Sequence, residues 1–383
     1  MTHLLIVIIY LAFVGLGLPD SLLGAAWPSM YVELAMPVSF AGILSLVISL
    51  ITMASTLFCS RMTARFGTGR VTGFSTALTA LAMLGYSIST RPWQLFLWAL
   101  PYGLGAGCID AALNNYVSLH YSSRHMSWLH CMWGLGASVG PYVIASALAS
   151  GGWQMGYRRV FFIQLALSAV LLCSLPLWKE NREAAEEEKS ALTLPETLRL
   201  PGVKAGIATF FCYCAVEQTA GLWAASFLVL QKGVNEETAA GLASLFYIGI
   251  TLGRALNGFV ANRYGDHTMT RFGEVVIGLG IAALFLPLPE AVTYAAFLII
   301  GLGCAPIFPS MIHASPAHFG EKNSPAAIGV QMTSAYAGTC AVPALFGVLV
   351  KRLGMGVMPW FLTLFFIPML LATEKLRGLA SEE

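Results

Sequence analysis

Twelve stretches of about twenty consecutive apolar residues constrain the fold of this chain more than any other feature. In lipid, backbone N–H and C=O groups must bond within the segment, and runs of this length do so as helices. We therefore predict an all-α membrane protein with twelve transmembrane helices. The runs cover residues 3–30, 39–60, 71–90, 93–121, 127–150, 157–178, 205–230, 239–262, 270–287, 291–314, 325–350 and 357–374.

Composition agrees with a membrane protein and excludes several other classes. Of the 383 residues, 57% are hydrophobic and only 10% are charged. The net charge of +2 comes without a dense basic cluster, so we expect no nucleic-acid binding. The cysteines lie in apolar runs, where a thiol behaves as a small hydrophobic group, and we expect no disulfide, metal site or cofactor. No segment outside the runs is large enough for an active site, so we predict no enzyme and no catalytic residue.

One long hydrophilic stretch, residues 179–204, divides the runs six and six. It contains three consecutive glutamates at 186–188 and two prolines, Pro195 and Pro201. We predict an N-terminal six-helix bundle (1–178), a cytoplasmic linker (179–204), a C-terminal six-helix bundle (205–374) and a cytoplasmic tail (375–383).

Lys and Arg residues are distributed unequally between the two sides that these runs define. With the N-terminus inside, fourteen of the 21 fall in cytoplasmic segments and six on the other side. Positive residues favour the cytoplasmic side. We therefore expect a multi-pass protein of the cytoplasmic (inner) membrane with both termini in the cytoplasm.

Corresponding motifs in the two halves are separated by a nearly constant number of residues. An Arg-x-Gly sequence at 65–67 recurs at 263–265, and Gly-Leu-Gly at 103–105 recurs at 301–303, each at an offset of 198. Asp20 and Glu217 are 197 residues apart. A constant offset indicates two pseudo-symmetric bundles, an arrangement in which transporters bind their substrate at the repeat interface.

Three carboxylates lie deep within the apolar runs: Asp20, Asp110 and Glu217. An ionised acid at the bilayer centre costs about 2.5 to 3.5 kcal/mol on insertion scales, so each needs a compensating interaction. The functional interpretation is that they couple proton binding to substrate binding, with sodium as an alternative ion. The structural interpretation is hydrogen bonding to a neighbouring helix, and for Glu217 an ion pair with Arg254.

The stretch Gly103–Asn115 combines small and polar residues in the fourth run. Asp110 and Asn114 are four residues apart, so a helix places them on one face. Gly103 and Gly107 share this spacing and let a neighbouring helix approach closely. We expect the substrate and the proton at the polar pair, with the glycines serving helix packing.

Amide and aromatic residues at similar depth complete the candidate site. Rings and fixed amide groups suit a sugar, whose apolar face stacks while its hydroxyls form hydrogen bonds. Arg254 can meet an anionic substrate or an acid, or extend to the cytoplasmic surface, and all these residues can equally serve helix packing. The candidate substrate-binding residues are Asn114, Asn115, Trp133, Trp223, Arg254, Asn257, Gln331 and Tyr336.

Twelve helices in two halves, with an Arg-x-Gly turn after helices 2 and 8, resemble the major facilitator superfamily. That family carries Gly-x-x-x-Asp-Arg-x-Gly in the loop after helix 2. The second half retains this pattern at Gly258–Gly265 except for Asn262, whereas the first half has Ser60 and Ala64 in place of the glycine and the acid. The resemblance implies that the two halves rock about a central site.

Two segments are similar to the fucose permease-like branch of that superfamily, the fucose:proton symporters. They are Pro19–Leu23, followed by Trp27 and Pro28, and Gly105–Asn114. The resemblance implies proton-coupled sugar uptake, in which Asp20 and Asp110 are the proton and substrate carboxylates and Asn114 lines the cavity.

A different segment is similar to the glycine–proline pattern of superfamily antiporters: Gly134-Leu135-Gly136 followed by Gly140-Pro141. We predict proton-coupled uptake of a sugar or similar small polar solute by alternating access. The alternatives are a proton-coupled exporter of amphipathic drugs or metabolites and a non-transporting membrane sensor. We expect a small-molecule substrate, protons and the lipid bilayer as partners, and a monomer.

Overall fold

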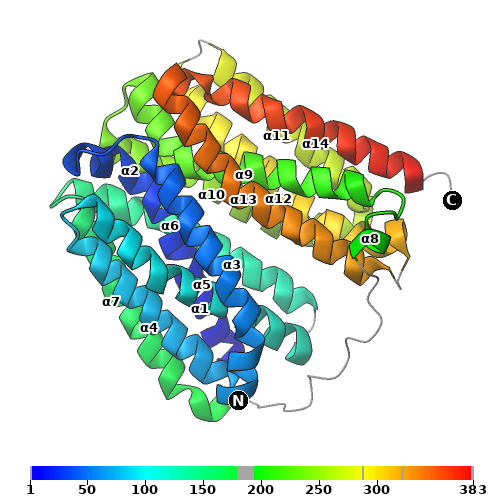
Figure 1. Ribbon diagram of the computed structural model, residues 1–383, viewed down its shortest axis with the longest axis horizontal. Coiled ribbons are helices and arrows are strands. Elements are labelled where there is room, and N and C mark those ends of the chain that lie inside the picture. The colour runs from blue at the N-terminus through cyan, green and yellow to red at the C-terminus, as the bar shows by residue number, and fades with distance from the viewer. Residues whose placement is uncertain (1, 122, 179–193, 287–288, 321–322, 381–383) are drawn as a thin grey trace.

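The computed structural model describes residues 2–121, 123–178, 194–286, 289–320 and 323–380, which form helices and short connections (Figure 1). No strand occurs among these residues, so the all-α prediction is confirmed. The helices are α1 (Thr2–Asp20), α2 (Leu22–Glu33), α3 (Phe40–Phe66), α4 (Thr68–Ser87), α5 (Pro92–His120), α6 (Ser123–Leu148), α7 (Trp153–Cys173), α8 (Leu194–Thr197), α9 (Val203–Lys232), α10 (Glu236–Tyr264), α11 (Asp266–Phe285), α12 (Glu290–Phe319), α13 (Ser324–Leu353) and α14 (Met358–Ala380).

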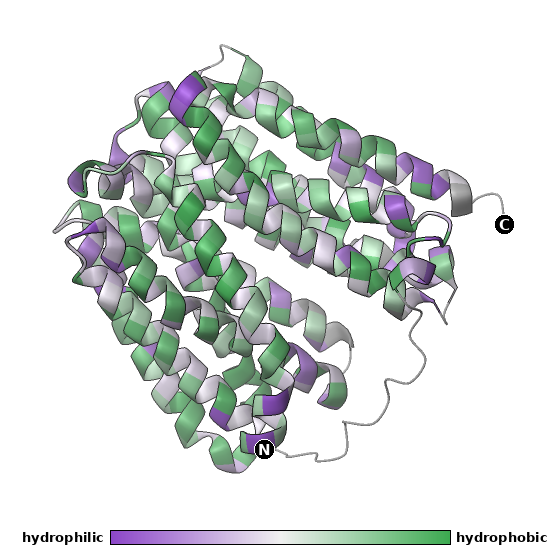
Figure 2. Cartoon of the chain, viewed as in Figure 1, coloured by the Kyte–Doolittle hydropathy of each residue, from purple (hydrophilic) through white to green (hydrophobic). Residues whose placement is uncertain are grey.

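Within the described ranges, 10 helices are long and apolar enough to cross a membrane, and the first of these joins α1 and α2 from Leu4 to Glu33. The long helices α4 and α9 do not meet this criterion: α4 is rich in threonine, and α9 contains Glu217 and Gln218. The predicted count of twelve spans is therefore not confirmed, although the chain is a multi-pass membrane protein. Figure 2 shows apolar residues along the helices and hydrophilic residues gathered near many helix ends.

The first predicted span, residues 3–30, is a helix interrupted at Ser21. Pro19 has no N–H, so the carbonyl of Gly15 lacks its helical donor. The buried side-chain amide of Gln164 in α7 donates to that carbonyl instead. α1 ends at Asp20, one residue after Pro19, and α2 begins at Leu22, which puts the first candidate acid at a helix end.

The helices form two packed groups, α1–α7 and α9–α14 (Figure 1). In the first group α5 packs against α3 and α4, and in the second α12 packs against α10 and α11. Between the groups, α6 packs against α10, α13 against α3, and α2 against α9. Since α3 corresponds to α10 and α6 to α13 in the predicted repeat, the first two of these contacts are equivalent. The packing thus follows the repeat seen in the sequence.

Glycines repeat the same close contacts in both groups. An added Cβ at Gly103 would lie 2.9 Å from the Ile48 carbonyl oxygen in α3, and one at Gly301 would lie 2.0 Å from the Phe246 carbonyl oxygen in the corresponding α10. Gly107 also faces α3, where the added atom would lie 2.3 Å from the Thr52 carbonyl oxygen. The predicted role of these glycines in close helix approach is confirmed.

The Arg-x-Gly turns also adopt the same conformation in both halves. Gly67 ends α3 with φ of 85°, and Gly265 follows α10 with φ of 75°. A left-handed backbone of this kind favours glycine because no Cβ clashes with the carbonyl. The arginine of each turn lies over the aromatic ring that follows it, Arg65 over Phe66 and Arg263 over Tyr264.

The two groups of helices meet closely at one end. An added Cβ at Gly24 in α2 would lie 2.7 Å from the carbonyl oxygen of Leu222 in α9. The hydroxyl of Ser29 donates a hydrogen bond to the carboxylate of Glu236, which also joins the two groups. Figure 1 shows the groups meeting near α2 and diverging toward the N-terminus and α8.

The connection between the groups was predicted as a linker over residues 179–204, of which 179–193 lie outside the described residues. The remainder contains α8 and a turn that leads into α9 at Val203. At the other end of the second group, α14 continues to Ala380, through most of the segment predicted as a tail. The domain boundaries stay a prediction.

Alanine at Gly105 or Gly303 is expected to destabilise the protein by a similar amount. The added Cβ would lie 2.5 Å from the Ser75 carbonyl oxygen in the first case and 2.6 Å from the Gly273 carbonyl oxygen in the second. Overpacking costs about 1–3 kcal/mol, so the unfolding midpoint of the purified protein should fall by a few degrees. Gly329→Ala is the control, because nothing lies within 4 Å of its added Cβ. Unchanged midpoints for both test variants would contradict the close approach.

Candidate functional site

Asp20, at the end of α1, accepts hydrogen bonds from two other helices. The Tyr102 hydroxyl in α5 donates to Oδ1 at 2.5 Å, and Nε1 of Trp133 in α6 donates to Oδ2 at 2.8 Å. Tyr102 is buried, whereas the Asp20 side chain is exposed. One carboxylate therefore joins α1, α5 and α6 and stays accessible to a ligand.

Trp133 also contacts the second group of helices through Arg254 in α10. The guanidinium carbon of Arg254 lies 5.2 Å from the centroid of the Trp133 ring. Its Nη2 lies 3.8 Å from Oε1 of Glu217 in α9. The side chains of Arg254 and Glu217 are 18% and 8% exposed, so Arg254 points into the protein and does not extend to the surface.

We call these five residues, Tyr102, Asp20, Trp133, Arg254 and Glu217, the central network. It connects three helices of the first group with two of the second, and the two acids related by the sequence repeat lie in it. A cation over an indole ring gains about 0.5–2 kcal/mol, and an ion pair at 3.8 Å is at the outer limit of such contacts. Arg254 is thus held by two moderate interactions, one to each half.

Asp110 and Asn114 form a separate pair within α5. Nδ2 of Asn114 donates to Oδ1 of Asp110 at 2.9 Å and to the Asp110 carbonyl oxygen at 3.0 Å. The prediction that they share a helix face is confirmed, and both side chains are half-buried. In the described part of the chain, no hydrogen bond or ion pair joins this pair to the central network.

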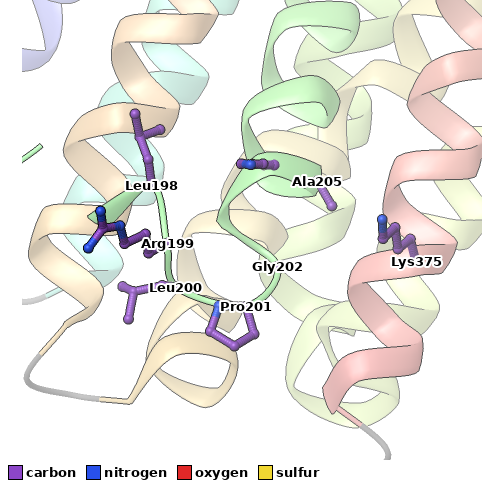
Figure 3. Close-up of a pocket in the computed structure, with 8 residues that line it drawn as sticks. Leu198, Arg199, Leu200, Pro201, Gly202, Ala205 and Lys375 are labelled. Atoms are coloured by element: carbon purple, nitrogen blue, oxygen red, sulfur yellow. The ribbon is translucent and has the colours of Figure 1, made fainter. Parts of the chain in front are cut away.

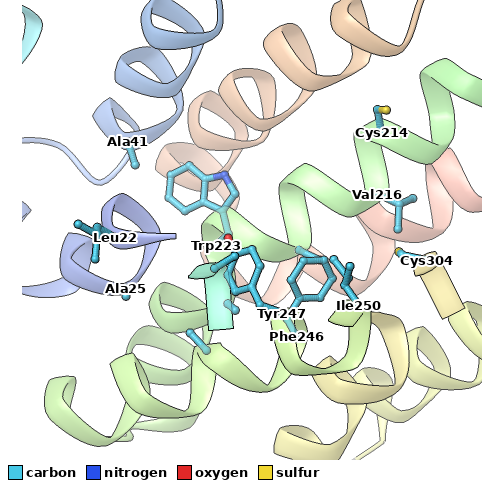
Figure 4. Close-up of a cluster of buried hydrophobic side chains, with 14 of the residues drawn as sticks. Leu22, Ala25, Ala41, Cys214, Val216, Trp223, Phe246, Tyr247, Ile250 and Cys304 are labelled. Carbon is cyan, nitrogen blue, oxygen red and sulfur yellow. The ribbon is translucent and has the colours of Figure 1, made fainter. Parts of the chain in front are cut away.

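Trp223 belongs to the end where the two groups meet. It is fully buried, and its Nε1 donates to the Pro343 carbonyl oxygen at 3.1 Å. Figure 4 shows it between Ala41 of α3 and Tyr247 of α10. These contacts are typical of a packing residue. Trp223 fills space where the two groups of helices meet at one end.

The other predicted residues are dispersed. Gln331 is fully buried, where its Oε1 accepts from the Ser315 hydroxyl at 3.3 Å. Asn257 is 9% exposed, Tyr336 is half-buried and Asn115 is exposed. The structure thus brings Asp20, Trp133, Arg254 and Glu217 together. Among the described residues, it shows no hydrogen bond or ion pair between this set and Gln331, Asn257, Tyr336 or Asn115.

Two further polar residues, Tyr102 and Glu274, were not among the predicted site residues. Tyr102 binds Asp20 from α5, and no spacing in the sequence indicates a contact between residues so far apart. Glu274 is a fourth carboxylate inside an apolar helix, α11, and it is 1% exposed. The count of three deep carboxylates was therefore wrong, although the criterion that found the others, an acid within an apolar run, also finds Glu274.

The chemistry available at the site is hydrogen bonding, ion pairing and aromatic stacking. No three His, Cys, Asp or Glu residues of the described segments are arranged to hold a metal ion. All eight cysteines are free thiols. The polar groups of the central network are two carboxylates, a guanidinium, a phenol hydroxyl and an indole N–H.

Membrane-spanning helices in two groups, with charged residues joining the groups in the interior, define a class of protein, the membrane transporters. The chain belongs to the Major Facilitator Superfamily, whose family model matches residues 9–343 and, in a second match, 205–378. This family consists of transporters, which confirms the prediction that the chain is not an enzyme. Membership of the fucose permease-like branch is not confirmed.

Three curated relatives are similar over much of the chain. The Bypass of stop codon protein 6 of Saccharomyces cerevisiae is 23% identical over 92% of this chain and 79% of its own length. The Glucose/mannose transporter GlcP of Bacillus subtilis is 28% identical over 62% of each chain. The Cis,cis-muconate transport protein of Acinetobacter baylyi is 24% identical over 81% of this chain and 80% of its own.

Among solved structures, the crystal structure of the nucleoside transporter NupG has the same fold. It aligns with a TM-score of 0.74 at 15% sequence identity, over 97% of this chain and 98% of that one. At this identity the likeness concerns the fold alone.

Glu217→Gln is expected to destabilise the protein, because Arg254 then keeps an interior charge without the carboxylate that pairs with it among the described residues. Breaking a fully buried pair costs about 3–5 kcal/mol. The long separation and partial exposure reduce this to about 1–2 kcal/mol, which should lower the unfolding midpoint by a few degrees.

A double-mutant cycle tests this pair. Glu217→Gln with Arg254→Gln should recover part of the loss, because it leaves no unpaired charge. Glu237→Gln, which removes an exposed acid at the start of α10, is the matched control and should unfold like the wild type. Additive effects of the two substitutions would show that the pair does not interact.

Proposed function

We propose that this transporter takes up a sugar or similar small polar solute together with protons by alternating access. The observation that carries the proposal is the central network, in which Asp20 and Glu217 are linked through Trp133 and Arg254 across the contact between the two groups of helices. Transporters built from repeats bind substrate and coupling ion at this interface.

Asp20 is the proposed proton site. As a carboxylate it accepts hydrogen bonds from both Tyr102 and Trp133. When it is protonated, one oxygen carries a hydrogen and becomes a donor, so its contact with α5 or α6 weakens. Protonation thereby changes how α1 is held and biases the equilibrium between outward-facing and inward-facing states.

Trp133 is the proposed platform for the solute. A sugar stacks its apolar face on an aromatic ring and offers its hydroxyls to neighbouring polar groups. In this conformation the guanidinium of Arg254 lies over the ring, so the sugar has to displace it. The displaced group is within reach of Glu217, so binding at one half strengthens an ion pair in the other.

The Asp110–Asn114 pair is the proposed second polar contact for the solute. An amide and an acid fixed to each other offer donors and acceptors in a constant geometry, which suits vicinal hydroxyls. The similarity to a glucose/mannose transporter supports a sugar as the solute. Asn115, Asn257, Tyr336 and the other predicted ligands remain candidates for contacts in other conformations.

We further propose that α4 and α9 cross the membrane as well, which gives twelve spans when α1 and α2 are counted as one. Both are packed between candidate spans, α4 against α5 and α7, and α9 against α13 and α14. If the protein lies in the inner membrane with both termini on its cytoplasmic side, the close contact at Gly24 and Trp223 lies on the outer side. In this orientation, the conformation of the structure is closed to the outside. We propose that the protein works as a monomer.

Proton-coupled export of amphipathic compounds is the second candidate. The glycines of α6 that are similar to the antiporter pattern lie at close contacts with the two helices that carry Arg254 and Asp20: an added Cβ at Gly134 would lie 2.5 Å from the Thr251 hydroxyl in α10, and one at Gly136 would lie 2.0 Å from the Val14 carbonyl oxygen in α1. The direction of flux separates the two candidates. Membership of a transporter family favours either of them over a sensor.

Asp20→Asn is expected to uncouple transport from protons. In right-side-out vesicles, glucose or mannose added to the wild type should alkalinise the medium and accumulate. The variant should lose alkalinisation and accumulation but retain exchange of labelled for unlabelled sugar, because an amide resembles the protonated acid, with one acceptor oxygen and one donor group, and no longer titrates. Glu237→Gln is the control and should behave like the wild type.

Asp110→Asn is expected to weaken binding of the solute as well as any coupling to protons. The substitution replaces one acceptor oxygen by an N–H donor, and loss of that one polar contact should raise the KM for sugar exchange by about tenfold. Vesicles that expel these sugars, or that show neither flux nor alkalinisation across a panel of sugars and nucleosides, would contradict uptake.

A further inference from the structure

A pocket of about 380 Å³ lies where the chain enters α9 (Figure 3). By helical rise it is roughly 20 Å along α9 from Glu217 and so is separate from the central network. Three of its lining residues are cations with exposed side chains, Arg199, Lys204 and Lys375. Figure 3 shows Arg199 and Lys375 on opposite sides of the turn formed by residues 200–202.

These three cations form no ion pair with any other described residue. The acid next to Lys375, Glu374, already binds Arg271 and Arg377, each at 2.9 Å. Three positive charges around one hollow repel one another, and a bound anion relieves that repulsion. The lining therefore favours an anionic ligand.

The start of α9 adds backbone donors to the same pocket. α9 begins at Val203 after Gly202, whose φ is 81°, so the chain turns sharply into the helix. Lys204 and Ala205 line the pocket and belong to the first turn, where N–H groups have no acceptor within the helix. A helix start of this kind binds phosphate oxygens.

The pocket lies near the end of an apolar span. The span of α14 runs from Met355 to Gly378, so Lys375 is three residues from its end. Leu198 and Leu200, which flank Arg199, are half-buried apolar residues in the lining. Cations beside apolar side chains at a span end lie at the depth of lipid headgroups.

We propose that this pocket binds a phosphate group through Arg199, Lys204, Lys375 and the first turn of α9. An anionic lipid headgroup and free phosphate present the same chemistry. The position at a span end favours the lipid, and the experiment separates the two sources.

The test measures binding to the full chain in detergent by native mass spectrometry and by thermal unfolding. The probes are phosphatidylglycerol, phosphatidylcholine and inorganic phosphate. The wild type should bind one phosphatidylglycerol saturably and prefer it to phosphatidylcholine. Binding should weaken at least about tenfold in the triple variant Arg199→Gln/Lys204→Gln/Lys375→Gln and about fivefold in Lys375→Gln alone, so the single variant serves if the triple variant does not fold.

The matched control removes three cations elsewhere, in Arg158→Gln/Lys351→Gln/Arg352→Gln, and should bind like the wild type. Displacement of the lipid by millimolar phosphate assigns the pocket to free phosphate, and absence of displacement assigns it to the headgroup. Absence of saturable binding of both phosphatidylglycerol and inorganic phosphate would overturn the proposal. So would unchanged affinity in the pocket variants, or an equal loss in the control.

Discussion

The cost of keeping a charge inside a membrane protein explains why these particular helices meet. Asp20 binds two donors, and Arg254 lies between a carboxylate and an aromatic face, because a charge within the membrane-spanning part of a protein is costly unless it has such partners. Tyr102, Trp133 and Glu217 supply these partners from three different helices. The central network therefore ties five helices together at one place, and it makes the contact between the two halves depend on the state of a few polar side chains.

Glycines set the distances within which this network forms. Apolar helices gain little from one another in lipid unless their backbones approach closely, and Gly105 and Gly303 provide that approach in equivalent places of the two halves. Because the packing repeats, the differences between the halves lie in their polar residues. At the offset of 198, Phe308 stands where the first half has Asp110, so only the first half has an acid at that position.

The sequence predicted the parts of this arrangement that depend on local spacing. Apolar runs gave the helices, the constant offset gave the repeat, and the possible pairing of Glu217 with Arg254 followed from two charges in neighbouring runs. Contacts that join distant helices escaped prediction, as for Tyr102, since many tertiary arrangements satisfy the same apolar pattern. Trp223 is a second example: it was predicted as a substrate-binding residue, but its full burial depends on which face of α9 meets α3 and α13, which the sequence does not specify.

Arg254 has two partners of similar strength, and in the proposed mechanism this balance allows a bound solute to move it. The cation–π contact with Trp133 and the distant ion pair with Glu217 each contribute about 1 kcal/mol, so a difference of 1.4 kcal/mol between them changes the ratio of the two arrangements about tenfold. One hydrogen bond from a bound solute is of that size. A solute bound on the Trp133 ring, as proposed, would therefore supply enough energy to shift Arg254 toward Glu217, whereas a tight salt bridge would hold the arginine in place whether or not a solute is bound.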